Sequence, residues 1–125
     1  DSFVVPSNLY IIGTMNTADK SIALLDIALR RRFEFVPKYP DATVEGVHDS
    51  VILSLLNKAI QSRKGYDFTI GHAYFMGSDY KLENTVNKKV IPLLLEYFMN
   101  NEDEVIKIFK EANITIGGWP LKMIV

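Results

Sequence analysis

The order of apolar and polar positions predicts a short α/β segment at the start of the chain. An uninterrupted apolar run indicates a fully buried strand over Leu9 to Thr14. A helix follows, which Asp19 or Ser21 can cap, with apolar residues at helical spacing: Ile22, Leu25, Ala28 and Leu29. Arg30 to Arg32 close this helix, where cations complement the helix dipole. The alternating residues Phe33 to Val36 predict a second strand.

The pattern after Asp41 predicts helices instead. The first of them stops before Gly65, and one stripe of apolar residues, broadened by Ile52 and Leu56, runs along it: Val44, Val47, Val51, Leu55 and Ala59. Glycines and aromatic residues then punctuate Lys64 to Ser78, which predicts a structured loop around a short helix or turn.

Two more helices and a tail complete the pattern. The first covers Asn84 to Met99, and Pro92 should kink or split it. Asp103 is the expected cap of the last helix, which turns these residues inward: Val105, Ile108, Phe109 and Ala112. The apolar tail, Ile114 to Val125, is compatible with an extended segment.

Together the elements predict a fold of the class α/β plus all-α. Residues 1–40 form a strand–helix–strand segment, and residues 41–125 form a small helical bundle, with the boundary near Lys38 to Asp41. In open α/β sheets, ligands bind beyond the carboxyl ends of the strands. The polar residues that follow the first strand are therefore where we look for function.

Composition excludes several kinds of site but leaves the predicted fold unchanged. The chain has 125 residues, of which 48% are apolar and 23% charged, a globular balance. Its 14 basic and 15 acidic residues give no overall signature of a nucleic-acid-binding protein, and Arg30 to Arg32 form the one dense basic patch. Without cysteine the chain has neither disulfides nor thiolate metal sites. The longest apolar stretch, Val90 to Leu95, is far too short to span a membrane.

Two groups of residues in the opening segment carry chemistry suited to phosphoryl transfer. Asn16 follows the first strand, and its amide can orient a water molecule or contact a phosphate oxygen. Arginines held by a short helix can reach the phosphate of a neighbouring subunit and stabilise charge during transfer. On residue types alone, the alternatives stay open: Asn16 as a turn or capping residue, and the arginines as a solvated helix end.

The exact residue string of this segment favours the functional roles of Asn16 and the arginines over the structural ones. GTMNTADKSIALLDIALRRRF, residues 13–33, closely resembles the sensor-1 to arginine-finger segment of the AAA+ NTPases related to McrB, the GTP-dependent motor of 5-methylcytosine-specific restriction systems. Lys20 stands where that family commonly has Arg. The resemblance continues more weakly through Ile70 to Phe75 and Ile91 to Phe98.

The resemblance implies roles for individual residues. Asn16 would be sensor 1, and Arg31 with Arg32 would be the arginine finger and its companion, acting in trans on the next subunit's nucleotide. Thr17, Asp19 and, in the helical lid, His72 would be further nucleotide-binding candidates. Two alternatives accompany these roles, since Asp19 can simply cap the helix and His72 can be a satisfied loop histidine.

Some parts of such an NTPase are missing from the sequence. It contains no G-x-x-x-x-G-K-[ST] phosphate loop and no acidic pair after an apolar strand. The resemblance therefore implies that GTP or ATP with Mg²⁺ is bound in a longer protein. We expect this chain to be a C-terminal fragment that is inactive alone, with no nucleotide or metal of its own.

The resemblance also implies partners. We expect a homo-oligomeric ring, a hexamer in the family, that works in the cytoplasm with a McrC-like nuclease subunit. DNA would be contacted through regions outside this chain, and no membrane is involved. Two other readings remain: a helical interaction module that docks a partner through Arg30 to Arg32, and an AAA+ relative without a restriction role.

A physical consequence follows for the isolated chain. A central strand cut from its sheet exposes apolar faces and unpaired edges. We therefore expect self-association through Leu9 to Ile12, or pairing of this segment with the apolar pieces at either end of the chain.

Overall fold

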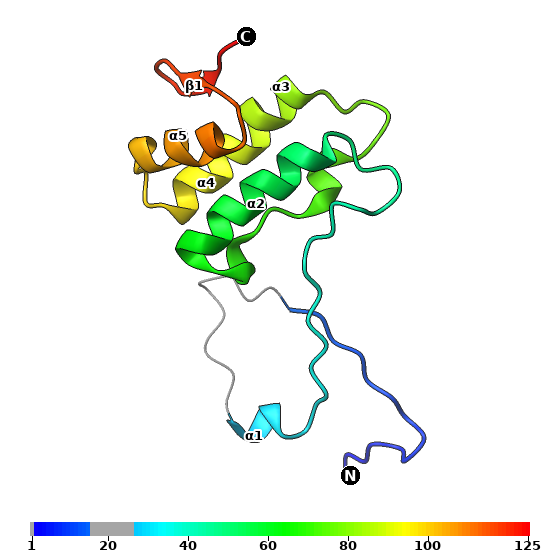
Figure 1. The fold of residues 1–125 in the computed structure, drawn as a ribbon. Helices are drawn as coiled ribbons and strands as arrows, with labels where there is room; N and C mark the ends of the chain where they lie inside the picture. The colour runs from blue at the N-terminus through cyan, green and yellow to red at the C-terminus, as the bar shows by residue number, and fades with distance from the viewer. Residues whose placement is uncertain (1, 16–26) are drawn as a thin grey trace. The chain divides into compact units, whose positions relative to one another are not determined.

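The computed structural model describes residues 2–15 and 27–125, and the chain divides into two units, Asp1–Phe33 and Glu34–Val125. The described part is mostly helical, with one small two-stranded sheet (Figure 1). The predicted boundary between an α/β part and a lid, after residue 40, stays a prediction.

The first unit lacks the strand that the sequence predicts. Residues 9–15 form neither helix nor strand, and Tyr10 and Ile12 expose 91% and 93% of their surface. A fully buried parallel strand needs strands beside it and helices over its faces. The described residues of this unit supply neither, so the prediction of a strand over Leu9 to Thr14 is wrong for this chain.

The predicted helix of the opening segment is only partly described. Helix α1, Ile27–Arg30, ends within the arginine cluster, and the earlier residues of the predicted helix lie outside the described ones. The second predicted strand, Phe33 to Val36, is also absent: these residues are exposed and pair with nothing in a sheet. The strand–helix–strand segment is thus not confirmed.

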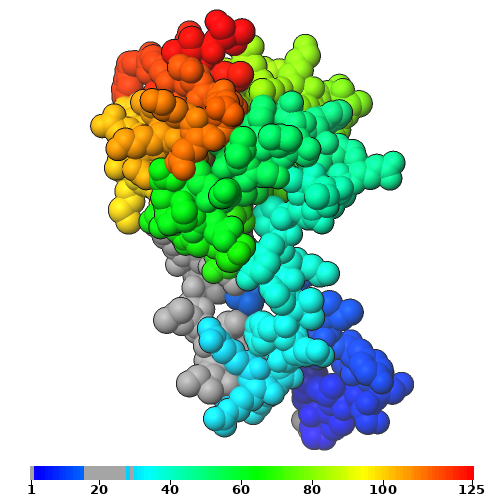
Figure 2. All heavy atoms as spheres, in the orientation of Figure 1, coloured from blue at the N-terminus to red at the C-terminus, as the bar shows by residue number. Residues whose placement is uncertain are grey.

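The second unit contains the helices. Its helical elements follow one another in this order: α2 (Ser50–Lys64), η1 (Tyr66–Phe68), η2 (His72–Phe75), α3 (Leu82–Thr85), η3 (Val86–Val90), α4 (Ile91–Tyr97) and α5 (Glu102–Glu111). Figure 1 shows α2, α4 and α5 lying side by side, and Figure 2 shows the atoms of α2, in green, against those of α5, in orange. A helical bundle after residue 41 is therefore confirmed, including short helical turns within Lys64 to Ser78.

Helix α2 ends where the sequence predicts but begins later. Gly65 follows its last residue with φ 92°, a conformation that glycine adopts without strain, and its N–H donates to the carbonyl of Gln61. The helix starts at Ser50, and the residues before it are irregular, with turns at 42–43 and 45–46. Of the predicted stripe, Leu56 and Ala59 are buried as expected, but Val51 is 69% exposed. Leu53 and Ile60, which the stripe omits, are also buried.

The predicted break at Pro92 takes a specific form. Residues 82–97 stay helical, but the turn before the proline, η3, widens to a π-helix. Proline has no N–H to donate to the preceding turn, and its ring crowds the carbonyl there. A wider turn accommodates both effects, so the helix is interrupted without a sharp end.

Helix α5 has a different cap from the predicted one. The side chain of Asn101 accepts a hydrogen bond from the backbone N–H of Glu104 at 3.2 Å, so Asn101 is the N-cap and Asp103 lies in the first turn. The predicted inner face is confirmed, because all four residues are buried: Val105, Ile108, Phe109 and Ala112.

The tail forms a small hairpin. Strand β1, Ile116–Gly117, pairs antiparallel with β2, Lys122–Met123, which confirms the expectation of an extended segment. The N–H of Met123 donates to the side chain of Asn87 at 2.7 Å, so the hairpin is attached to η3. The apolar end of the chain thus pairs with β1.

Arg63 joins two helices of the bundle. Its guanidinium makes ion pairs with Glu104 and Glu111 of α5, the latter at 2.6 Å, and donates to the carbonyl of Ala59 in its own helix. These contacts lie over the edge of the core, where the Arg63 side chain is 24% exposed. The α2–α5 contact therefore combines apolar packing with ion pairs.

Candidate functional site

The arginine cluster lies at an exposed helix end. Arg30 is the last residue of α1, and Arg31 and Arg32 occupy the turn that follows. All three side chains are exposed, and none pairs with an acidic residue in the described part of the chain. The arginine cluster thus lies on the surface of the described part of the chain.

Three predicted site residues cannot be placed. Asn16, Thr17 and Asp19 lie outside the described residues, so the proposed sensor 1 and its neighbours have no geometry here. Arg31 and Arg32 belong to the first unit, and His72 belongs to the second.

His72 is held by the segment that precedes α2. The backbone N–H of Asp41 donates to Nδ1 of His72 at 3.0 Å. An accepting nitrogen carries no proton, so this hydrogen bond assigns the proton of the neutral ring to Nε2. His72, the first residue of η2, is therefore held through Nδ1, and its Nε2 has no hydrogen-bond partner among the described residues.

Asp41 is itself fixed by a local turn. Its carboxylate accepts from the hydroxyl of Thr43 at 2.6 Å and from the backbone N–H of Thr43 at 2.9 Å. These two hydrogen bonds hold the pKa of Asp41 below its usual range. The turn keeps the Asp41 backbone in position for His72.

A second histidine belongs to another cluster. His48 is exposed, and its ring stacks on Tyr80 with centroids 4.9 Å apart. The hydroxyl of Tyr80 donates to Asp49 at 2.7 Å, and burial together with this carboxylate raises the pKa of Tyr80. The cluster is consistent with a structural contact between the start of α2 and the loop before α3.

The aromatic residues of the 64–78 loop divide into two groups. Phe75 is fully buried and Phe68 packs half-buried against the core, as expected for residues of a lid core. Tyr66 and Tyr74 instead expose 53% and 38% of their surface, so they lie outside the core.

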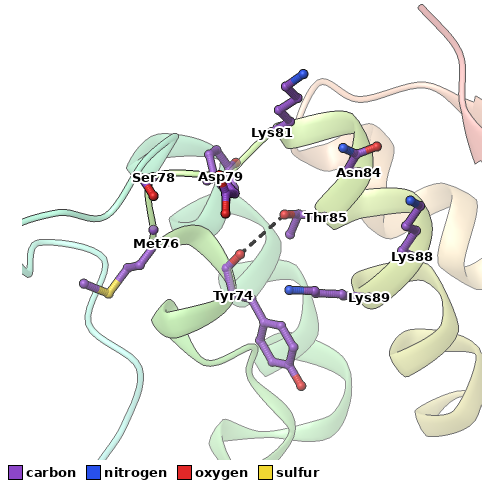
Figure 3. Close-up of a pocket in the computed structure, with 11 residues that line it drawn as sticks. Tyr74, Met76, Ser78, Asp79, Lys81, Asn84, Thr85, Lys88 and Lys89 are labelled. Atoms are coloured by element: carbon purple, nitrogen blue, oxygen red, sulfur yellow. Dashed lines mark hydrogen bonds between the residues drawn. The ribbon is translucent and has the colours of Figure 1, made fainter.

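One pocket was not anticipated from the sequence. It has a volume of about 370 Å³ and lies between the loop 74–80 and the helical stretch that starts at Leu82 (Figure 3). We call it the lysine pocket, after the cations among its lining residues: Lys81, Lys88 and Lys89. A signal was present, because residues 81, 84, 85, 88 and 89 repeat at the spacing of one helical face.

Other kinds of site find no support in the described residues. No group of three or more His, Asp or Glu side chains there could hold a metal ion. No helix among those residues is both long and apolar enough to cross a membrane.

Comparison with known proteins identifies the helical part. Residues 50–106, from the start of α2 into α5, match the family described as "McrB, alpha-helical lid domain". The chain is of the McrB type. It is also similar to the "Type IV methyl-directed restriction enzyme EcoKMcrB subunit" of Escherichia coli K12, with 36% identity over 143 aligned positions that cover 94% of this chain.

The extent of the two matches differs. The chain spans about 30% of the length of the E. coli relative. The family match begins at residue 50, where α2 begins, and it includes His72 and every residue that lines the lysine pocket. Both features therefore belong to the McrB-type lid domain.

Proposed function

We propose that this chain is part of the motor subunit of a McrB-type restriction system. The motor hydrolyses GTP or ATP with Mg²⁺ in a homo-oligomeric ring and drives a McrC-like nuclease on DNA. The observation that carries the proposal is the 36% identity to the E. coli McrB subunit over 94% of the chain, because an alignment of that extent includes most of both units.

The exposed arginines support a role at a subunit boundary. Arg31 and Arg32 follow the last residue of α1 and have no acidic partner among the described residues. A guanidinium aimed at a neighbour's nucleotide must be free of such a partner, since its charge is needed in the transition state. Asn16, as sensor 1, would act on the subunit's own nucleotide.

In this proposal His72 is the lid's candidate for nucleotide contact. Its Nδ1 is occupied by the N–H of Asp41, which leaves Nε2–H to donate to a ligand oxygen or nitrogen. The same residue would then connect the nucleotide to the segment that leads back to the arginine cluster. Thr17 and Asp19 remain further candidates for nucleotide binding.

Substitutions in the full-length protein test the arginine finger. We expect Arg31→Ala or Arg32→Ala to lower the rate of nucleotide hydrolysis about 100-fold or more, with nucleotide affinity nearly unchanged, because a finger acts in the transition state. Arg30→Ala is the matched control and should retain most of the activity. Steady-state turnover and equilibrium nucleotide binding measure the two effects separately.

The same experiment addresses the competing reading, a helical interaction module that docks a partner through Arg30 to Arg32. Equal turnover in the Arg31, Arg32 and Arg30 variants would contradict the finger. Weaker partner binding in all three variants, without an effect on hydrolysis, would favour the docking module instead.

A further inference from the structure

The lysine pocket is a cationic surface on a chain with a net charge of -1. Lys81, Lys88 and Lys89 line it, and Asp79 is the acidic residue among its lining residues. None of the three lysines forms an ion pair with another residue that the structure describes. Three lysines against one carboxylate leave the lining of the pocket with a net positive charge.

The helix geometry brings these cations together. The opposite side of the same helical stretch is buried through Val86 and Val90, so the lysine-bearing face is turned to solvent. The π-helical turn carries both Lys88 and Lys89, and Figure 3 shows Lys89 extended toward Tyr74 across the pocket. Wider turns of this kind occur frequently at functional sites.

Polar groups of the lining can assist the lysines in binding an anion. Asn84 and Ser78 line the pocket and can donate hydrogen bonds to oxygen. Thr85 is already engaged, since its hydroxyl donates to the carbonyl of Tyr74 at 3.5 Å. The site thus offers ammonium, amide and hydroxyl donors to a ligand rich in acceptors.

The spacing of the cations favours a repeating anion. Lys81 directly precedes α3, and Lys88 and Lys89 lie on η3, seven and eight positions further along the chain. A nucleic-acid strand offers a phosphate to each cation of such a stretch, because its phosphates recur along the backbone.

We propose that the lysine pocket binds successive phosphates of a DNA backbone. The choice of DNA rests on the proposed function, in which the motor acts on DNA. It adds a contact in the lid to the DNA contacts that the resemblance to McrB-type proteins implies for regions outside this chain.

Binding of a labelled DNA duplex to this 125-residue chain tests the proposal, with fluorescence anisotropy measured over a series of salt concentrations. The pocket variant carries Lys88→Gln and Lys89→Gln. Lys58→Gln with Lys107→Gln is the matched control, because it removes the same charge from exposed positions on α2 and α5, away from the pocket.

We expect the pocket variant to bind DNA roughly tenfold more weakly at low salt. The slope of log affinity against log salt should fall by about 2, because two lysines no longer neutralise a phosphate each. The control should keep a slope near that of the unchanged chain. Each single substitution, Lys88→Gln or Lys89→Gln, should give about half the change in slope.

Three outcomes would overturn the proposal. They are equal slopes for the pocket variant and the control, no DNA binding by the unchanged chain at low salt, and saturable binding of inorganic tripolyphosphate without binding of DNA. The last result would assign the pocket to a free polyanion. Since anisotropy requires no hydrolysis, failure here is distinguishable from failure of the arginine-finger assignment.

Discussion

Asn101 and Asp103 allow two capping assignments to be compared at one helix end. The side chain of Asn101 accepts from the N–H of Glu104, whereas Asp103 lies in the first turn of α5. We expect Asn101→Ala to lower the free energy of unfolding by about 1 kcal/mol, because an N–H is left without its acceptor. Asp103→Ala should cost only about 0.3–0.5 kcal/mol, through the helix dipole.

Urea denaturation followed by circular dichroism measures both variants. A larger decrease in the free energy of unfolding for Asp103→Ala than for Asn101→Ala would contradict the capping assignment. The apolar spacing predicts a helix that starts near these residues, with Asp103 as its cap. Which side chain accepts depends on the backbone conformation before the helix, and Asn101 is extended there with ψ 90°.

Helix α2 allows a similar comparison at the scale of an element. Leu53 has no exposed surface, and Val51 on the same helix is 69% exposed. We expect Leu53→Ala to cost roughly 2–5 kcal/mol, because it leaves a cavity in the core. Val51→Ala should change stability by less than about 0.5 kcal/mol, since alanine is the better helix former and the valine side chain is mostly in solvent.

The comparison tests the orientation of α2 directly. The predicted stripe placed Val51 inside and omitted Leu53, so it implies the opposite order of effects on stability. Midpoints of thermal unfolding are sufficient to rank the two variants. A greater destabilisation by Val51→Ala would restore the predicted orientation.

The apolar pattern was ambiguous because α2 carries apolar residues on most of its circumference. Val51, Ile52, Leu53, Leu55 and Leu56 fall within six positions, and several stripes fit them equally well. Packing in the core selects the face that contains Leu53 and Leu56, both of which are fully buried. By contrast, the break at Pro92 was predictable, since it follows from the covalent structure of proline.

At the scale of the whole molecule, the exposed apolar residues of the first unit predict that copies of the chain associate. Phe3, Tyr10 and Ile12 each expose more than nine-tenths of their surface, far more apolar exposure than isolated surface residues provide. We expect the chain to form larger species as its concentration rises, because burying these side chains against a second copy is favourable. Size-exclusion chromatography with light scattering measures the mass.

Ile12→Lys should shift the chain toward the monomer. Val51→Lys is the matched control, since it introduces the same charge at an exposed apolar position of α2. A monomer at every concentration of the unchanged chain would contradict the prediction. Equal effects of the two substitutions would place the contact elsewhere.

The sequence by itself determined the features that depend on local chemistry. The end of α2 at Gly65, the interruption before Pro92 and the inner face of α5 follow from backbone preferences and apolar spacing. The exact string of residues 13–33 also pointed to the McrB-type family, whose lid the comparison then matched at residues 50–106.

Only the tertiary structure decided the features that depend on partners distant in the sequence. The hydrogen bond from Asp41 to His72 and the ion pairs from Arg63 to α5 join residues that are 31 to 48 positions apart in the sequence. The orientation of α2 depends on contacts of the same kind. The lysine pocket likewise needs the loop 74–80 placed against the helix that follows. A buried strand over Leu9 to Thr14 failed for the same reason, since a strand exists only where neighbouring strands accept its hydrogen bonds.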